Sequence, residues 1–354
     1  MQQPSDGFRP LRVAAVEHDT DDSVIVSFDG TLGFVHGQHL TLRRQFGDTE
    51  VRRSYSICSP APKGDLRIAI KHVPGGVFST WATTDLKPGD MIDVLPPAGH
   101  FSHELDPSGR RRYTMLAAGS GITPVFSIMA TILAEEPNAE VTLLYLNRTS
   151  QSTMLLDELQ DLRDRYLGRL SIAFAFTREE TGGELLSGRP DRCRLDQLIE
   201  AGFLPADAHH AFLCGPLDLI TEAEQALIDA GMAADAVHRE IFTTNQPGRV
   251  SLAPQVVTET SVAVATGRAT LHGRATGFDL YEGDSVLDAV QRVRPDAPFS
   301  CRSGVCSTCQ AVVREGEVTM TVNYGLTNDE VARGYVLTCQ SKPTTSHVDV
   351  DYDA

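Results

Sequence analysis

Four cysteines close to the C-terminus constrain this chain more than any other feature of its sequence. Their spacing is C-x4-C-x2-C-x29-C, and the residues are Cys301, Cys306, Cys309 and Cys339. A short loop with three thiolates, closed by a fourth much further along the chain, supplies two thiolates to each of two irons. Soft thiolates are also the ligands that iron–sulfur clusters prefer. The spacing therefore predicts a [2Fe–2S] centre.

Two alternatives for these cysteines are a zinc site and disulfide bonds. Structural zinc usually uses paired C-x2-C knuckles, whereas the first spacing here is x4 and Cys339 has no near partner. The N-terminal residues contain no apolar signal core, and no apolar run reaches the length of a membrane span. We therefore expect a cytoplasmic protein without a membrane partner, in which disulfides are rare. The scattered Cys58, Cys193 and Cys214 are expected to be reduced.

Length and charge narrow the class of protein. A chain of 354 residues is long for one domain, so two or three are expected. An apolar content of 41% and a charged content of 22% are typical of globular proteins. The net charge of −16 argues against nucleic acid as a partner, because such binding needs a basic face.

The residue pattern divides the chain into three segments. Residues 1–106 show runs of alternating apolar residues between Gly and Pro turns, which predicts an antiparallel β-barrel. Residues 107–244 alternate between strand and helix patterns, which predicts a doubly wound α/β domain with a parallel sheet. Residues 245–258 have the composition of a linker, and residues 259–354 form the domain that carries the four cysteines.

The first segment carries two pieces of a predicted flavin site. The first piece is R-S-Y-S at residues 53–56, where an arginine can pair with pyrophosphate and the tyrosine can pack on an isoalloxazine ring. The second is G-G-V-F-S at residues 75–79, where a glycine turn before a helix presents backbone N–H groups to an anion. An exposed strand end and a simple glycine turn are the structural alternatives. Together, the two pieces favour FAD.

The second segment carries a predicted nicotinamide nucleotide site. G-S-G-I-T-P at residues 119–124 follows a strand and opens a helix, although Pro124 stands where a third glycine is usual. Arg148 follows the next strand, at a place where a carboxylate usually selects NAD. This favours NADPH and leaves NADH as the alternative. C-G-P at residues 214–216 ends a later strand, where ligands of open α/β sheets bind.

These motifs, in this order, resemble the ferredoxin–NADP reductase superfamily over residues 8–244, and residues 259–354 resemble a plant-type ferredoxin with an α+β, β-grasp fold. Within the superfamily, residues 52–58, 71–76 and 330–341 are similar to the reductase subunits of phenylacetyl-CoA epoxidase. This second resemblance covers nearly the whole chain.

The resemblance implies roles for individual residues. Ser56, Cys214 and Glu240 match the serine, cysteine and glutamate that surround the nicotinamide and flavin N5; the alternatives are a buried thiol for Cys214 and a surface carboxylate for Glu240. Phe242 matches an aromatic that stacks on flavin in relatives that end there, whereas a linker and a domain follow it here. The residues implied to hold FAD are His39, Arg53, Ser54, Tyr55, Ser56, Lys71, Gly76, Val77 and Ser79. Those implied to hold the nucleotide are Gly119, Gly121, Thr123, Arg148, Cys214, Gly215 and Pro216.

The three predicted cofactors suggest an electron path. NADPH gives two electrons as a hydride, a [2Fe–2S] centre takes one, and FAD accommodates both kinds of step. The chain contains no H-E-x-x-H, no E-x-x-H pairs and no Rieske histidines, so any oxygenase must be a separate protein. We predict an oxidoreductase that supplies electrons to an oxygenase, which the resemblance identifies as the di-iron phenylacetyl-CoA epoxidase. A Rieske or haem oxygenase as partner, and a redox sensor without turnover, are the alternatives.

Overall fold

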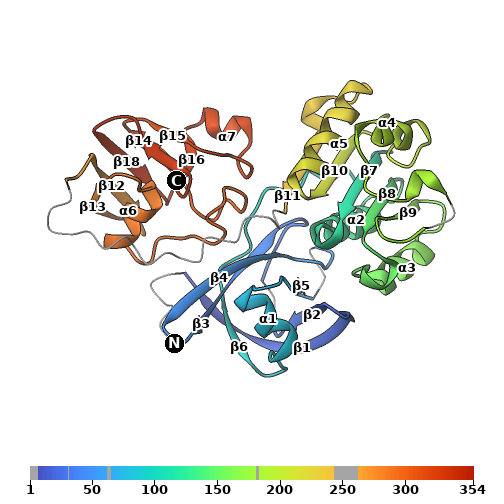
Figure 1. Cartoon of the computed structure of the whole chain (residues 1–354), viewed down its shortest axis with the longest axis horizontal. Coiled ribbons are helices and arrows are strands. Elements are labelled where there is room, and N and C mark those ends of the chain that lie inside the picture. The colour runs from blue at the N-terminus through green and yellow to red at the C-terminus, as the bar shows by residue number, and fades with distance from the viewer. Residues whose placement is uncertain (1–6, 31, 62–64, 181–182, 243–261) are drawn as a thin grey trace.

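The computed structural model describes residues 7–30, 32–61, 65–180, 183–242 and 262–354 (Figure 1). The predicted linker, residues 245–258, lies outside the described residues. Within them, three sheet-centred domains follow one another along the chain.

The first domain is an antiparallel sheet with the order β4-β3-β6-β1-β2-β5. An isolated bridge between Ile57 and Ile68 brings β4 back to β5, so the sheet closes into the predicted barrel. The helix α1 (Val77–Thr84) covers the barrel with Phe78 and Trp81. The strands are β1 (Arg9–Thr20), β2 (Ser23–Phe28), β3 (His39–Phe46), β4 (Thr49–Ser56), β5 (Arg67–Lys71) and β6 (Met91–Val94).

The second domain is a parallel sheet with the order β11-β10-β7-β8-β9. Apolar residues of α2 and α3 pack on one face of this sheet, and those of α4 and α5 pack on the other, so the predicted doubly wound fold is confirmed. The strands are β7 (Arg112–Ala118), β8 (Glu140–Asn147), β9 (Leu170–Phe176), β10 (His210–Gly215) and β11 (Val237–Ile241). The helices are α2 (Ile122–Glu135), α3 (Leu156–Arg165), α4 (Arg192–Glu200) and α5 (Leu217–Asp229), with short 3₁₀ turns η1 (Gly119–Gly121), η2 (Ser150–Ser152), η3 (Glu184–Leu186) and η4 (Ala234–Ala236).

The third domain has a mixed sheet with the order β13-β12-β18-β14-β16 and a separate two-stranded ribbon. The helix α6 (Val286–Val293) begins at a capping box of Ser285 and Asp288 and buries one face against the sheet. This is the α+β arrangement predicted for the segment. The remaining elements are β12 (Ala265–Leu271), β13 (Arg274–Leu280), β14 (Gln310–Glu315), β15 (Val318–Met320), α7 (Asn328–Ala332), β16 (Tyr335–Leu337), β17 (Ser341–Pro343) and β18 (His347–Asp351).

The first two domains share a core. Ile25, Cys58 and Ala69 of the barrel pack in the same apolar cluster as α2. The Ser127 hydroxyl of α2 donates to the Ser59 carbonyl at 2.7 Å, and the Thr131 hydroxyl accepts from the Ala61 N–H at 2.9 Å. Barrel and parallel sheet therefore form one unit, and Figure 1 shows the third domain beside β4 of the barrel.

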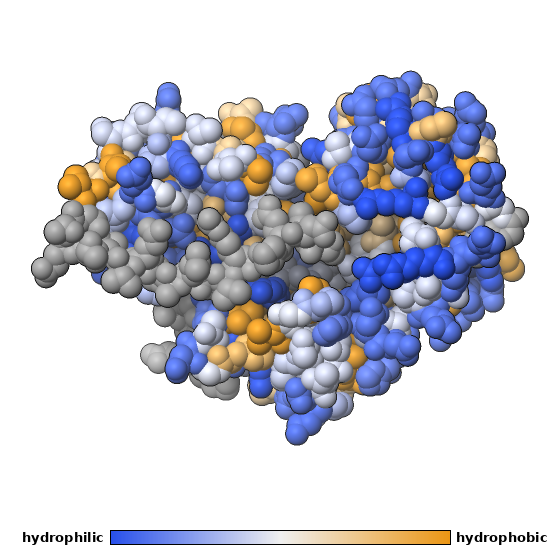
Figure 2. All heavy atoms as spheres, in the orientation of Figure 1, coloured by the Kyte–Doolittle hydropathy of each residue, from blue (hydrophilic) through white to orange (hydrophobic). Residues whose placement is uncertain are grey.

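The surface shows no large apolar region on the face drawn in Figure 2, where hydrophobic residues lie in small groups among polar ones. Within the described part of the chain, no helix combines the length and the apolar character that a membrane span requires.

Candidate functional site

The ends of β3 and β4 bring together two of the predicted flavin residues. His39 pairs with Ser56 in the antiparallel register. The His39 side chain is 4% exposed, its Nε2 atom has no hydrogen-bond partner, and burial lowers its pKa to about 4. His39 is therefore a neutral imidazole at pH 7, with one ring nitrogen that has no protein partner.

Side chains alternate along β4, so this strand has two functional faces. Tyr55 lies against Phe78 of α1, with 5.8 Å between the ring centroids. Ser54 faces the other way, and its hydroxyl donates to the Ser300 hydroxyl of the third domain at 2.8 Å. Arg53 shares the alternation of Tyr55 and donates to the Arg52 carbonyl at 2.7 Å.

The glycine turn before α1 has the shape of an anion cradle. Gly76 is the N-cap of α1 and provides no side-chain cap, so the N–H groups of the first turn, at Val77 onward, are available to a ligand. A Cβ atom at Gly76 would lie 2.6 Å from Ser79 Oγ and 3.0 Å from the Val73 carbonyl oxygen. The Ser79 hydroxyl accepts from Val73 N–H and donates to the Gly76 carbonyl, so it shapes the turn. Lys71, at the end of β5, pairs with Asp22 at 3.0 Å.

The predicted nucleotide turn contacts the end of β10. A Cβ atom at Gly121 would lie 2.3 Å from the Cys214 carbonyl oxygen, and one at Gly215 would lie 2.8 Å from Ala118 Cβ. Gly119 has a φ of 55°. Only glycine permits this close approach, which places residues 119–121 directly beside residues 214–216. The Thr123 hydroxyl donates to the Ser120 carbonyl at 3.0 Å and closes the turn.

Cys214 and Glu240 lie side by side on neighbouring parallel strands. Cys214 is fully buried, and burial, followed by the nearby Glu240 charge, raises the pKa of its thiol. The Oε2 atom of Glu240 is buried without a hydrogen-bond partner, and burial raises the pKa of this carboxyl to about 8. Phe242 follows directly, with its N–H bonded to the Gly215 carbonyl at 2.8 Å. A buried carboxyl with an unpartnered oxygen is typical of a functional site.

The end of β8 holds a contact that sequence reasoning missed. Arg148, the residue predicted to select NADPH, is exposed there. The carboxylate of Glu179, which follows β9, accepts hydrogen bonds from the N–H of Ser150 at 2.9 Å and from its hydroxyl at 3.2 Å. Because β8 and β9 are adjacent parallel strands, residues that follow them lie at the same sheet edge, and this could have indicated the contact. Ser150 and Glu179 are 29 residues apart, so no local motif joins them.

Three of the predicted metal ligands, Cys301, Cys306 and Cys309, lie in one loop of the third domain, and Cys339, which follows β16, lies beside Cys309. Hydrogen bonding to Cys306 lowers the pKa of the Cys301 thiol, and hydrogen bonding to Cys309 lowers that of Cys339. Backbone N–H groups of Ser303 and Cys306 point to the Cys301 sulfur at 3.4 Å. The loop holds positive φ angles at Arg302, Gly304 and Ser307, which turn successive N–H groups inward.

The sulfur positions distinguish between one metal ion and two. In a tetrahedral zinc site, Zn–S bonds of about 2.3 Å place all sulfurs within about 3.8 Å of one another. Among the described residues, the only three ligand-type side chains whose ligand atoms all lie within 4.8 Å are Glu315, His347 and Asp349, at the far end of β14. The cysteines thus form two pairs, which fits a cluster of two irons.

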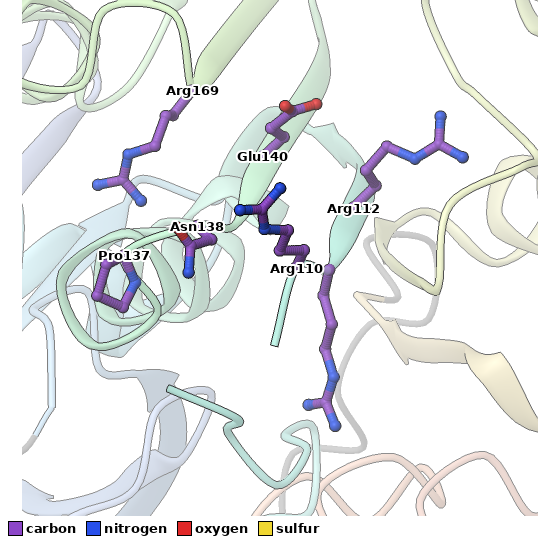
Figure 3. A pocket seen from close by; sticks show the side chains of 7 residues that line it. Arg110, Arg112, Pro137, Asn138, Glu140 and Arg169 are labelled. Carbon is purple, nitrogen blue, oxygen red and sulfur yellow. The ribbon is translucent and has the colours of Figure 1, made fainter. Parts of the chain in front are cut away.

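A basic hollow lies away from these residues, at the amino ends of β7 and β8 (Figure 3). Two of its arginines have structural partners: Arg112 pairs with Asp207, and Arg169 donates to carbonyls at the end of α2. The labelled arginine side chains also point in different directions in Figure 3. This hollow is therefore no part of the candidate site.

A histidine cluster lies near the same end of the sheet, where the first two domains meet. The His103 ring bonds the Tyr113 hydroxyl at 2.9 Å, and that hydroxyl donates to the buried Glu136 carboxylate at 2.8 Å. Burial lowers the pKa of His103 to about 3 and that of His36 and His238 to about 4, and neighbouring imidazoles contribute at His103 and His238. The rings belong to His36, His103, His210 and His238.

These neutral histidines predict acid sensitivity. Their folded pKa values lie below the unfolded value of 6.5, so the unfolded chain binds extra protons and stability falls as the pH drops from about 6.5 toward 4. We expect His238→Phe, which preserves stacking on Phe212, to lose less stability than the wild type over this interval. The difference between the two proteins should be at most about 1.4 kcal/mol per pH unit. Melting temperatures at pH 7 and pH 5 measure this, with exposed His18→Phe as the control. If the melting temperatures of His238→Phe and of the wild type fell equally between pH 7 and pH 5, His238 would not contribute to the acid sensitivity.

The described residues fit three kinds of bound group: a flavin, a dinucleotide and an iron–sulfur cluster. The unpartnered atoms of His39 and Glu240 and the crowded glycines at 76 and 121 match a flavin and a dinucleotide. The paired thiols match a [2Fe–2S] cluster.

Comparison with known families agrees with this arrangement. Residues 15–103 match the oxidoreductase FAD-binding domain, residues 115–225 the oxidoreductase NAD-binding domain, and residues 269–344 the 2Fe-2S iron-sulfur cluster binding domain.

Two full-length relatives are similar throughout. One component of the 1,2-phenylacetyl-CoA epoxidase of Escherichia coli K12 is 39% identical, covering 98% of each chain. The ferredoxin reductase component of 3-ketosteroid-9-alpha-monooxygenase from Mycobacterium tuberculosis is 34% identical, covering 97% of this chain and 95% of the relative. Among solved structures, phthalate dioxygenase reductase has the same fold, with a TM-score of 0.58, 22% identity and 98% of each chain covered.

Proposed function

This chain belongs to the family of oxygenase reductases that join FAD-binding, NAD-binding and [2Fe–2S] domains in one polypeptide, and we propose that it carries electrons from NADPH through FAD and the cluster to a separate di-iron oxygenase. The observation that supports this path is the two-faced strand β4. Tyr55 lies toward α1, and Ser54 bonds Ser300, which directly precedes the cluster ligand Cys301.

Each cofactor has candidate residues in the proposal. The guanidinium of Arg53 and the uncapped turn at Gly76 would hold the pyrophosphate of FAD, while Tyr55, Ser56 and His39 would hold the isoalloxazine. FAD supplies the conversion between hydride and single-electron transfer. Ser56, Cys214 and Glu240 would lie beside the reacting atoms, where the buried Cys214 thiol and Glu240 carboxyl would exclude water.

For the partner, we propose the di-iron type because the relative from Escherichia coli is a component of a phenylacetyl-CoA epoxidase. The relative from Mycobacterium tuberculosis serves a monooxygenase of steroids, so a different oxygenase is the second candidate. Reconstitution with each kind of oxygenase distinguishes the two.

For the coenzyme, we propose NADPH on the strength of the exposed Arg148, while Glu179 favours the NADH alternative. We expect Arg148→Ala to raise KM for NADPH by about 10- to 100-fold and to change KM for NADH little, since a charged pair with phosphate is lost. Glu179→Gln should lower KM for NADPH by removing a negative charge. Arg165→Ala, an exposed change on α3, is the control. An NADH preference that survives in Glu179→Gln would exclude the NADPH proposal.

The experiment that tests the function is an anaerobic titration with NADPH, followed by visible absorbance and EPR. Bleaching of a flavin band together with the rhombic signal of one reduced [2Fe–2S] centre is the expected result. Flavin bleaching without that signal would exclude delivery of electrons through the cluster. Absence of bleaching, with flavin and iron bound, would favour the sensor alternative.

A further inference from the structure

Arg52 on β4 is a buried arginine that none of the predicted cofactor sites uses. Its side chain is 5% exposed and pairs with Glu50 at 2.8 Å. Because side chains alternate along a strand, Arg52 shares its face of β4 with Ser54, and Arg53 and Tyr55 take the other face. It therefore stands on the side of the flavin strand that meets the third domain.

Besides Glu50 and the Phe8 ring of its own domain, Arg52 contacts the segment that leads into the cluster loop. The guanidinium carbon lies 4.1 Å from the centre of the Phe299 ring, a stacking geometry that favours a cation on an aromatic face. Its Nη1 atom donates to the Ala297 carbonyl at 3.4 Å. Only Ser300 separates Phe299 from the ligand Cys301.

Two hydroxyl pairs continue this contact along the loop. Ser54 bonds Ser300 at 2.8 Å, and Thr41 on β3 lies 3.3 Å from Thr308, the residue before Cys309. Both pairs join small side chains through single hydrogen bonds. Arg52 has a larger side chain than Ser54 or Thr41, and it combines a ring contact with a hydrogen bond. It therefore fixes the loop more firmly than either hydroxyl pair.

We propose that Arg52 is a positioning residue that seats the cluster loop on the outer face of the flavin strand and thereby sets the rate at which the cluster is reduced. This inference rests on the proposed function. In the step concerned, one electron leaves reduced FAD and one ferric iron of the cluster becomes ferrous, with no bond made or broken. The rate of such a step falls steeply with distance, so a loosened loop slows it while hydride transfer to the flavin, which does not pass through the cluster loop, continues.

Stopped-flow reduction by NADPH under anaerobic conditions separates the two steps. We expect Arg52→Ala to slow cluster reduction by about 10-fold, the effect of losing one cation–ring contact and one hydrogen bond, with flavin reduction unchanged. Arg52→Lys retains the charge and loses the planar stack, so its cluster should be reduced at a rate between those of the wild type and Arg52→Ala. Arg12→Ala removes an exposed ion pair on β1 and is the matched control.

Amide hydrogen exchange in the oxidised protein without NADPH gives a readout independent of turnover. Faster exchange in Arg52→Ala, confined to β4 and residues 297–308, is expected. Phe299→Leu removes the same ring contact from the other domain, together with the contact of Arg302 on this ring, so in the double variant the two effects should sum to less than their total.

The outcomes separate the inference from the function on which it rests. Cluster reduction at the wild-type rate in Arg52→Ala, equal slowing of flavin and cluster reduction, or additive effects with Phe299→Leu would each overturn the role of Arg52. A wild-type protein whose flavin is reduced and whose cluster is not would overturn the proposed function instead. Should Arg52→Ala fail to fold, Arg52→Lys and Phe299→Leu carry the same test.

Discussion

Replacing Cys309 with serine should abolish electron delivery through the cluster while NADPH continues to reduce the flavin. Cys309 is buried, pairs with Cys339, and its carbonyl accepts the buried Thr338 hydroxyl at 2.8 Å, so the backbone at this ligand is firmly held. A serine oxygen is a poor substitute for a soft thiolate. We expect reduction of cytochrome c, which draws on the cluster, to fall by at least about 100-fold, and reduction of ferricyanide, which draws on the flavin, to change little.

The control for this prediction is Cys193→Ser, because Cys193 is exposed on α4 and remote from the four ligands in sequence. Iron content and the EPR signal should be lost in Cys309→Ser and retained in Cys193→Ser. Full cytochrome c reduction in an iron-free Cys309→Ser protein would mean that electrons leave directly from the flavin.

Local sequence was sufficient for the parts of the site that lie in one loop or one strand–turn–helix unit. Cys301, Cys306, Cys309 and the turn at residues 119–124 belong to this class, because a short stretch sets both their spacing and their backbone shape. Cys339 lies 30 residues beyond Cys309, and only the fold brings the two together. The barrel and the doubly wound sheet also followed from apolar periodicity and turn residues.

Contacts between distant segments could not be predicted in this way. Ser54 was assigned to the flavin by resemblance, and its bond to Ser300 depends on how two domains meet, 246 residues apart. Glu179 reaches Ser150 because two strands end at one sheet edge. The buried contacts of Arg52 have the same origin, since nothing in the neighbourhood of residue 52 specifies Phe299. Tertiary packing determines such pairs, and only the folded chain displays them.

The rate of flavin reduction should depend on pH because of Glu240. Burial raises the pKa of its carboxyl to about 8, so Glu240 is mostly neutral at pH 7 and becomes a carboxylate as the pH rises. A carboxylate beside Cys214 stabilises the positive charge that a nicotinamide ring acquires when its hydride departs. We expect the rate of flavin reduction by NADPH to rise through an apparent pKa of about 8. Glu240→Gln should stay at the low-pH rate, about 100-fold below the wild type at high pH.

Stability gives an independent test of the same carboxyl group. Its folded pKa is raised above the unfolded value of 4.5, so the native protein retains a proton that the unfolded chain releases between these values. The stabilising contribution of Glu240 is complete below pH 4.5 and is lost as the pH rises through about 8. Between pH 7 and pH 9 the melting temperature of the wild type should therefore fall more than that of Glu240→Gln. Glu222→Gln, an exposed change on α5, should follow the wild type. If flavin reduction and melting temperature varied with pH in Glu240→Gln as they do in the wild type, the carboxyl of Glu240 would already be ionised at pH 7.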